Sequence, residues 1–190
     1  MSATVVLIGD SIRMGYEQTV RERLEGRVTI WSPPENGGNS RNVLAHLEAW
    51  VESCPPTLVH LNGGLHDLRR EFGVASNAVP LGEYEENLRT IIKRILDSGA
   101  HLIWATTTPV NQERHHAVKE FDRFEADVET YNAAAACVVA TRSLPVDDLY
   151  TLVMAHGRDE LLLSDGVHYT VEGYRLLGSQ VAQSIGAALG

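Results

Sequence analysis

Short runs of β-branched and other apolar residues alternate along this chain with longer segments in which apolar residues recur every three or four positions. The short runs are typical of buried strands, and the longer segments are typical of helices with one apolar face. Tyr16, Val20 and Leu24, spaced four residues apart, form such a face. Strands are predicted at residues 5–8, 27–32, 57–62, 101–108 and 144–149. Helices are predicted at residues 12–24, 40–53, 83–99, 123–141 and 171–189.

The alternation of strands and helices predicts an α/β fold in which helices cover both faces of a parallel sheet. No internal repeat, low-complexity tract or linker interrupts the pattern, so residues 1–190 are expected to form a single domain. In such sheets, functional groups gather outside the carboxyl ends of the strands. Catalytic side chains are therefore expected where the predicted strands end.

Polar, glycine-rich segments follow the first three predicted strands, and a fourth such segment precedes the last helix. They read GDS at 9–11, ENGGNS at 35–40, NGGLHDL at 62–68 and SDGVHYT at 164–170. Acyl transfer from an ester needs a nucleophile, a base, a group that orients the base, and donors to the oxyanion. Together the four segments contain a suitable residue for each role.

Ser11 is the predicted nucleophile, because a serine at the start of a helix exposes its Oγ at the strand end. Asp165 and His168 are the predicted orienting acid and base. Their spacing lets the carboxylate reach Nδ1 of the imidazole and leaves Nε2 to face Ser11. Simpler explanations exist for each motif alone: a serine that only caps a helix, a solvated loop acid, and a histidine that only packs.

The backbone N–H groups of Ser11 and Gly38 and the ring of His66 are the predicted donors to the oxyanion. Alone, Gly38 is explained equally by a tight turn, and His66 by a loop histidine with local partners. A metal-binding role for His66 is not favoured, since neither an H-x-x-x-H nor a C-x-x-C pattern accompanies it. No metal or cofactor is therefore predicted.

Taken together, these motifs resemble the SGNH/GDSL hydrolase superfamily of esterases and related deacylases. GDS resembles its first block, GNS at 38–40 its second, GLHD at 64–67 its third and DGVH at 165–168 its fifth. The resemblance spans nearly the whole chain. It implies a flavodoxin-like three-layer α/β/α sandwich with a mostly five-stranded parallel sheet, and it implies catalysis without a metal or organic cofactor.

The same resemblance implies a triad of Ser11, His168 and Asp165, with Gly38 as an oxyanion donor. The chain departs from the family at His66, which stands where the third block usually has asparagine. A neutral imidazole can also donate one N–H, so the oxyanion hole is expected to use a different donor. Asn62 lies four residues earlier and is not taken as the substitute.

Charge and composition disfavour some classes of binding partner for this 190-residue chain, whose net charge is -9. An acidic protein is a poor ligand for nucleic acid and for anionic membranes. The two cysteines form no metal-type or disulfide scaffold, and Cys137, in an Ala/Val helical run, is expected to be a buried thiol. No signal peptide or transmembrane run is evident, so a cytoplasmic location is the default expectation.

Several further residues near strand ends are candidates for the rim of the site. Residues 106–124 are expected to form an extended loop there, with His115 and His116 on it. Four arginines are candidates for binding a substrate carboxylate or sugar hydroxyls, although solvated helix or loop positions are the simpler explanation. These are Arg13, Arg41, Arg69 and Arg70.

The sequence therefore predicts a serine esterase acting on small carboxylic esters, with acetyl groups on a sugar or small alcohol as the expected substrates. That substrate preference follows from the family resemblance. Two alternatives remain open at this point: thioester hydrolysis or acyl transfer at the same site, and a non-catalytic domain that binds carbohydrate.

Overall fold

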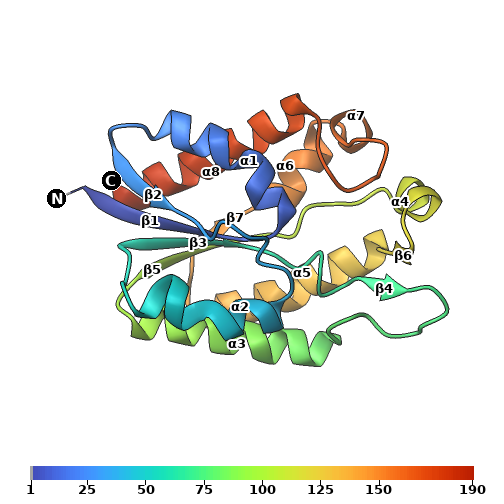
Figure 1. The fold of residues 1–190 in the computed structure, drawn as a ribbon, viewed down its shortest axis with the longest axis horizontal. Coiled ribbons are helices and arrows are strands. Elements are labelled where there is room, and N and C mark those ends of the chain that lie inside the picture. Colours follow the sequence, from blue (N-terminus) through green and yellow to red (C-terminus); the bar gives the residue numbers. More distant parts are fainter. Residues whose placement is uncertain (1) are drawn as a thin grey trace.

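A five-stranded parallel sheet forms the centre of the computed structural model, which describes residues 2–190 (Figure 1). The strand order is β2-β1-β3-β5-β7. The strands are β1 (Ala3–Ile8), β2 (Val28–Trp31), β3 (Leu58–Asn62), β5 (His101–Ala105) and β7 (Val146–Asp147). Strand addition reverses direction between β1 and β3, which is the flavodoxin-like order. The predicted fold class is confirmed.

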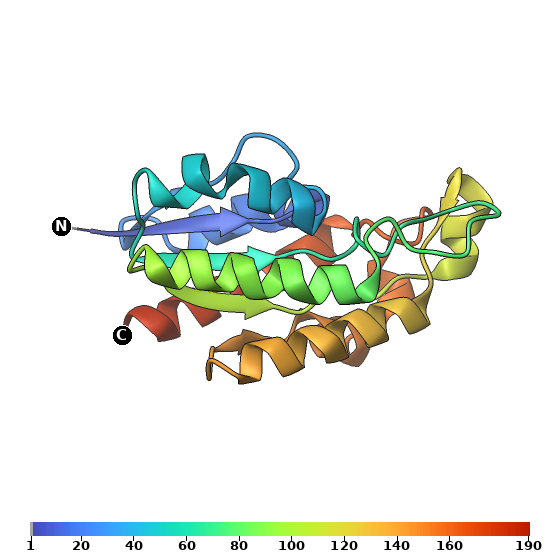
Figure 2. The ribbon, with the colours of Figure 1, turned by 90° about the horizontal axis from the view of Figure 1, so that it is seen from below.

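Helices cover both faces of the sheet and give the expected three layers (Figures 1 and 2). One outer layer holds α1 (Ser11–Arg23), α6 (Leu149–Ala155) and α8 (Val171–Leu189). The other holds α2 (Ser40–Leu47), α3 (Leu81–Asp97) and α5 (Glu125–Ala140). None of the helices in residues 2–190 combines the length and the apolar character that crossing a bilayer requires.

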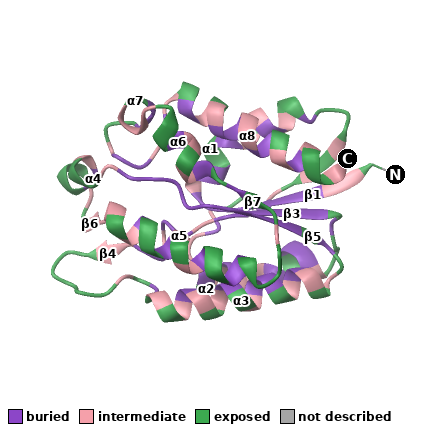
Figure 3. Cartoon of the chain, turned by 180° about the vertical axis from the view of Figure 1, so that it is seen from behind, coloured by how far each residue is buried: buried purple, intermediate pink, exposed green. Residues whose placement is uncertain are grey.

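The core lies on both faces of the sheet, as the burial colours show (Figure 3). All five residues of β3 are buried, which explains why its sequence does not alternate between apolar and polar positions. The longer helices each add several apolar side chains to the core. In α3 they include a stripe of Leu88, Ile91, Ile92 and Ile95, all at most 3% exposed.

A small extension projects beyond the carboxyl ends of the strands (Figures 1 and 2). It contains the antiparallel pair β4 (Arg70–Glu71) and β6 (Phe121–Asp122) and the short helices α4 (Gln112–Val118) and α7 (Arg158–Leu161). The prediction of an extended loop over 106–124 is therefore wrong. Asn111 starts α4, because its side chain accepts a hydrogen bond from the backbone N–H of Arg114.

Three further expectations need correction. The helix predicted over 40–53 is α-helical only to Leu47 and continues as a π-helical segment, η1 (Glu48–Glu52). The last strand is only two residues long. Cys137 is exposed, because α5 turns Ala135, Val138 and Val139 toward the core and places Cys137 on the opposite face.

The contact between α1 and α8 depends on Gly178, where an added Cβ would lie 2.6 Å from Thr19 Cβ and 2.8 Å from the Tyr16 carbonyl oxygen. Gly178→Ala should therefore lower the free energy of unfolding by about 1–3 kcal/mol. Gly186→Ala, on the same helix, is the control. Its nearest neighbour is the Arg27 guanidinium at 3.6 Å, and alanine's helix propensity should make it neutral or slightly stabilising. Urea unfolding compares the two, and equal stability of both variants would contradict this packing argument.

Candidate active site

Ser11 is the first residue of α1, immediately beyond the carboxyl end of β1. Asp10 precedes it as the helix cap: its Oδ1 accepts the N–H of Ile12 at 2.9 Å, and it is only 1% exposed. An acid at this point satisfies a first-turn N–H and favours the positive end of the helix. The N–H of Ser11 itself has no partner within the helix, because it belongs to the first turn.

His168 links Ser11 to Asp165 in a continuous chain of hydrogen bonds. Its Nε2 lies 2.9 Å from Ser11 Oγ, and its Nδ1 lies 2.6 Å from Asp165 Oδ2. Asp165 Oδ1 also accepts the backbone N–H groups of Val167 and His168, at 3.1 and 3.0 Å, which fixes the turn before α8. The structure therefore brings the three predicted residues together across more than 150 residues of sequence.

Asp165 is held in its ionised form. Burial would raise the pKa of its carboxyl, but the hydrogen bonds from the ring and backbone of His168 and from Val167 outweigh it and lower the pKa well below the usual range. Lys119 Nζ lies 3.3 Å from Asp165 Oδ2 and also favours the charge. An ionised Asp165 selects the imidazole tautomer with the proton on Nδ1, which leaves the Nε2 lone pair facing Ser11 Oγ.

Gly38 lies in the loop between β2 and α2, which is anchored to the end of β1. The N–H of Gly37 donates to the Gly9 carbonyl oxygen at 3.0 Å. Arg13 on α1 donates to the carbonyl oxygens of Pro33 and Glu35. Gly38 has a φ of +63°, and its N–H donates to Asn36 Oδ1 at 2.8 Å. The predicted Gly38 donor therefore has an internal acceptor in this structure.

His66 follows β3 and is half-buried. Burial is the main cause that lowers the pKa of its imidazole. The positive charges of Arg123 and Arg69 act in the same direction, as does a protonated His168, whereas the carboxylate of Asp10 opposes them. His66 is therefore neutral at neutral pH and has one ring N–H to donate.

Comparison with known protein families identifies the family of this chain. A model of the GDSL-like Lipase/Acylhydrolase family matches residues 7–176. The chain belongs to this family. It is therefore an ester-hydrolysing enzyme, and the alternative of a non-catalytic carbohydrate-binding domain is set aside. A comparison with curated protein sequences gave no significant match.

Solved structures with the same fold cover nearly all of this GDSL-like hydrolase. A lipase/acylhydrolase from Enterococcus faecalis is 25% identical, with a TM-score of 0.84 over 99% of this chain and 97% of that one. Axe2, an acetylxylan esterase from Geobacillus stearothermophilus, is 19% identical, with a TM-score of 0.75 over 97% and 94%. The acetyl xylan esterase AlAXEase is 17% identical, with a TM-score of 0.77 over 96% and 99%.

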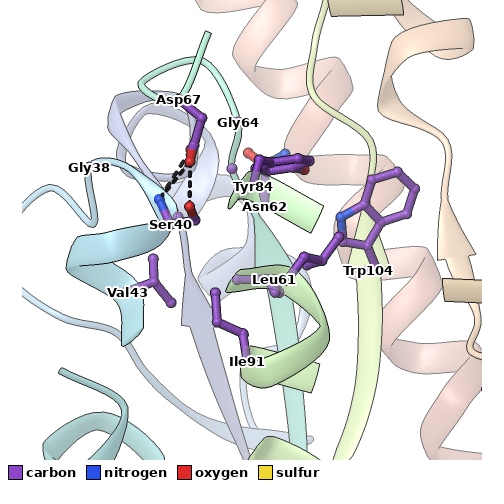
Figure 4. A pocket seen from close by; sticks show the side chains of 13 residues that line it. Gly38, Ser40, Val43, Leu61, Asn62, Gly64, Asp67, Tyr84, Ile91 and Trp104 are labelled. Atoms are coloured by element: carbon purple, nitrogen blue, oxygen red, sulfur yellow. Dashed lines mark hydrogen bonds between the residues drawn. The ribbon is translucent and has the colours of Figure 1, made fainter. Parts of the chain in front are cut away.

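The hydrolase has a small cavity of about 30 Å³ beside the Gly38 loop (Figure 4). Its apolar wall comes from β3, β5, α2 and α3, and Asp67 and Ser40 lie on its polar side. The side chains of the apolar wall are Val43, Leu61, Tyr84, Leu88, Ile91 and Trp104. Gly9, Gly38, Asn62, Gly63 and Gly64 complete the lining.

Asp67 is a buried residue of the site that the sequence reasoning passed over. Its carboxylate accepts the N–H of Ser40 at 3.0 and 3.1 Å and the Ser40 hydroxyl at 2.5 Å. These bonds tie the start of α2, next to Gly38, to the segment that carries His66. The available signal was an acid directly after His66 in NGGLHDL, but nothing in the sequence indicates that its partner is Ser40.

The other candidates from the sequence serve structural contacts. His115 is fully buried against Arg123, so it does not line the rim, while His116 is exposed and pairs with Asp122. The four candidate arginines each pair with a carboxylate: Arg13 with Glu17, Arg41 with Glu83, Arg69 with Glu71 and Arg70 with Asp127. Across residues 2–190, no three His, Cys, Asp or Glu side chains gather closely enough to hold a metal ion.

Asp67 predicts a specific pH dependence of stability, because burial raises the pKa of its carboxyl to about 6. The native protein thus binds this proton more tightly than the unfolded chain, where an aspartate titrates near pH 4. The carboxyl's contribution to the free energy of unfolding is fully present below about pH 4 and is lost as the pH rises through about 6. The stability of the wild type relative to Asp67→Asn should fall over that window, by up to about 3 kcal/mol.

Urea unfolding of both proteins at several pH values from about 4 to 8 measures this difference. Subtracting the Asp67→Asn curve removes the contributions of all other titrating groups. A difference that stays flat, or that grows as the pH rises, would show that Asp67 does not carry the raised pKa.

Proposed function

We propose that this GDSL-type hydrolase is a serine esterase that works through an acyl-enzyme. The observation that carries the proposal is the hydrogen-bonded chain from Ser11 Oγ through His168 to Asp165, with distances of 2.9 and 2.6 Å. His168 Nε2 takes the proton of Ser11 as Oγ attacks the ester carbonyl carbon. Asp165 stabilises the imidazolium that forms, and the same proton then passes to the leaving alcohol.

Water resolves the acyl-enzyme in the second half of the reaction. His168 takes a proton from water as its oxygen attacks the Ser11 ester, and returns a proton to Ser11 Oγ when the carboxylic acid leaves. The negative oxygen of each tetrahedral intermediate is stabilised by the N–H groups of Ser11 and Gly38 and by the ring N–H of His66. At Gly38 the substrate oxygen replaces Asn36 Oδ1 as the acceptor.

The acyl groups that we propose for the substrate are short, above all acetyl. The cavity of about 30 Å³ beside Gly38 does not define the acyl pocket, because Ser11, His168 and His66 do not line it. Two enzymes with the same fold are named as acetyl xylan esterases. These two relatives share only the fold with this chain. By analogy with them, we propose an acetylated sugar or small alcohol as the substrate class.

A panel of p-nitrophenyl esters with acyl chains of increasing length tests the acyl preference, and matched thioesters, with and without an acceptor alcohol, test the alternative chemistries. The acetyl oxygen ester should give the highest kcat/KM. Faster turnover of long-chain esters or of thioesters would overturn the proposed substrate class.

Ser11→Ala should lower kcat on p-nitrophenyl acetate by a factor on the order of 10⁴ or more, because no nucleophile remains at the end of β1. The wild type should be labelled by a fluorophosphonate probe and the variant should not. Ser179→Ala is the control, since Ser179 Oγ only donates to the Arg175 carbonyl on α8. If Ser11→Ala keeps the wild-type kcat while folded, another residue is the nucleophile.

His66→Ala should lower kcat by about a hundredfold or more and leave KM nearly unchanged, because an oxyanion donor acts mainly in the transition state. His66→Asn introduces an amide donor at the same position and should recover part of that loss. Kinetic constants and melting temperatures of both variants provide the measurement. A purely packing histidine would give two less stable proteins with unaltered kcat.

A further inference from the structure

Arg123 is a buried arginine beside the site to which the proposed mechanism gives no role. It lies between β6 and α5 and is 6% exposed. Its Nε–H donates to the Leu65 carbonyl oxygen at 2.6 Å, and its Nη1–H donates to His115 Nε2 at 3.0 Å. Its guanidinium carbon lies 4.9 Å from the centre of the Phe121 ring.

The charge of Arg123 is not neutralised locally. Within residues 2–190, no carboxylate oxygen comes within 4.0 Å of its guanidinium nitrogens. Its second partner, His115, is neutral, because burial and the Arg123 charge lower the pKa of that imidazole to about 4. Arg69 adds a second cation 3.9 Å from the centre of the same Phe121 ring.

The positive charge of Arg123 is unfavourable in this buried environment without a carboxylate partner among residues 2–190. Burial is the main cause that lowers the pKa of Arg123 to about 10; the charge of Arg69 acts in the same direction, whereas Asp10 and Asp165 oppose it. Replacing buried charged residues by apolar ones often stabilises a fold. Arg123 is therefore expected to have a role other than stabilising the fold.

The contacts of Arg123 indicate that role. Leu65, whose carbonyl accepts the Nε–H, is the residue directly before His66. The bond therefore fixes the backbone from which the His66 ring projects. The charged and titratable groups around His66 are Asp10 at the start of α1, Arg69 before β4, Arg123, and His168 before α8.

We propose that Arg123 is a positioning residue for ester hydrolysis: the hydrogen bond from its Nε–H to the Leu65 carbonyl oxygen holds the Leu65–His66 segment in place. The charge of Arg123 adds to burial in lowering the pKa of the His66 imidazole. The inference rests on the proposed role of His66 as an oxyanion donor. An uncharged ring presents a single N–H to the oxyanion and places no second cation beside His168 when that residue takes the serine proton.

Two substitutions separate the two effects. Arg123→Lys keeps a positive charge but cannot reproduce both hydrogen bonds of the rigid guanidinium. Arg123→Gln removes the charge as well. Arg70→Gln is the matched control, because Arg70 is a neighbouring arginine whose guanidinium lies over Phe124 and bonds to Asn77 and Asp127 rather than to Leu65 or His66.

The readouts are the NMR titration midpoint of the His66 ring, assigned with His66→Asn, and the kinetic constants on p-nitrophenyl acetate. Both Arg123 variants should lose about tenfold to a hundredfold in kcat, with KM nearly unchanged, because a misplaced donor weakens transition-state binding. The His66 midpoint should rise in Arg123→Gln and stay near the wild-type value in Arg123→Lys. Arg70→Gln should match the wild type in both measurements.

A purely structural Arg123 would change the melting temperature alone, so unaltered kcat in folded Arg123→Lys or Arg123→Gln would overturn the proposal. If Arg123→Gln does not fold, the kcat of Arg123→Lys decides. Failure of the proposed function looks different: the wild type would not hydrolyse the ester, or His66→Ala would keep its kcat, whereas the NMR arm would still report whether Arg123 controls the His66 charge.

Discussion

The whole site depends on one close backbone contact, in which the ends of β1 and β3 and the loop after β2 meet with no side chain between them. The Gly37 N–H donates to the Gly9 carbonyl at 3.0 Å. A Cβ on Gly37 would lie 2.7 Å from that carbonyl oxygen, and a Cβ on Gly9 would lie 2.7 Å from the Asn62 carbonyl oxygen. Real Cβ atoms do not approach backbone so closely, so the segments that lead to Ser11 and Gly38 can meet in this way only with glycine at both positions.

Around this contact, backbone N–H groups hold three acids: Asp10 and Asp165 at their own turns, and Asp67 through the distant start of α2. Asp10 accepts the N–H of Ile12, Asp67 that of Ser40, and Asp165 those of Val167 and His168. Backbone donors carry no net charge and have little freedom to move, so they stabilise a carboxylate in a fixed position. At Asp165 the cation of Lys119 adds to their effect, whereas at Asp67 burial outweighs it and raises the pKa.

The sequence was sufficient to predict the sheet, its covering helices and the meeting of Ser11, His168 and Asp165, because each depends on local periodicity or on residues at strand ends. The hydrogen-bond partners that lie far apart in the sequence could not be predicted. Nothing near Asp67 indicates Ser40, and nothing near Arg123 indicates the Leu65 carbonyl. The extension of α4, β4 and β6 was missed for a related reason: its elements are too short to show a period and are stabilised by contacts with distant segments.

An imidazole in the oxyanion hole has a physical consequence that an asparagine amide would not have. The amide is neutral at every pH, whereas a histidine in the proposed donor role can gain a proton, and a charge on His168 would disfavour that proton on His66. A second imidazolium beside the base would oppose the proton transfer that starts the reaction. Burial and the charge of Arg123 act against that state, whereas Asp10 favours it. In the proposed mechanism, the buried arginine therefore helps His66 to act as an uncharged donor.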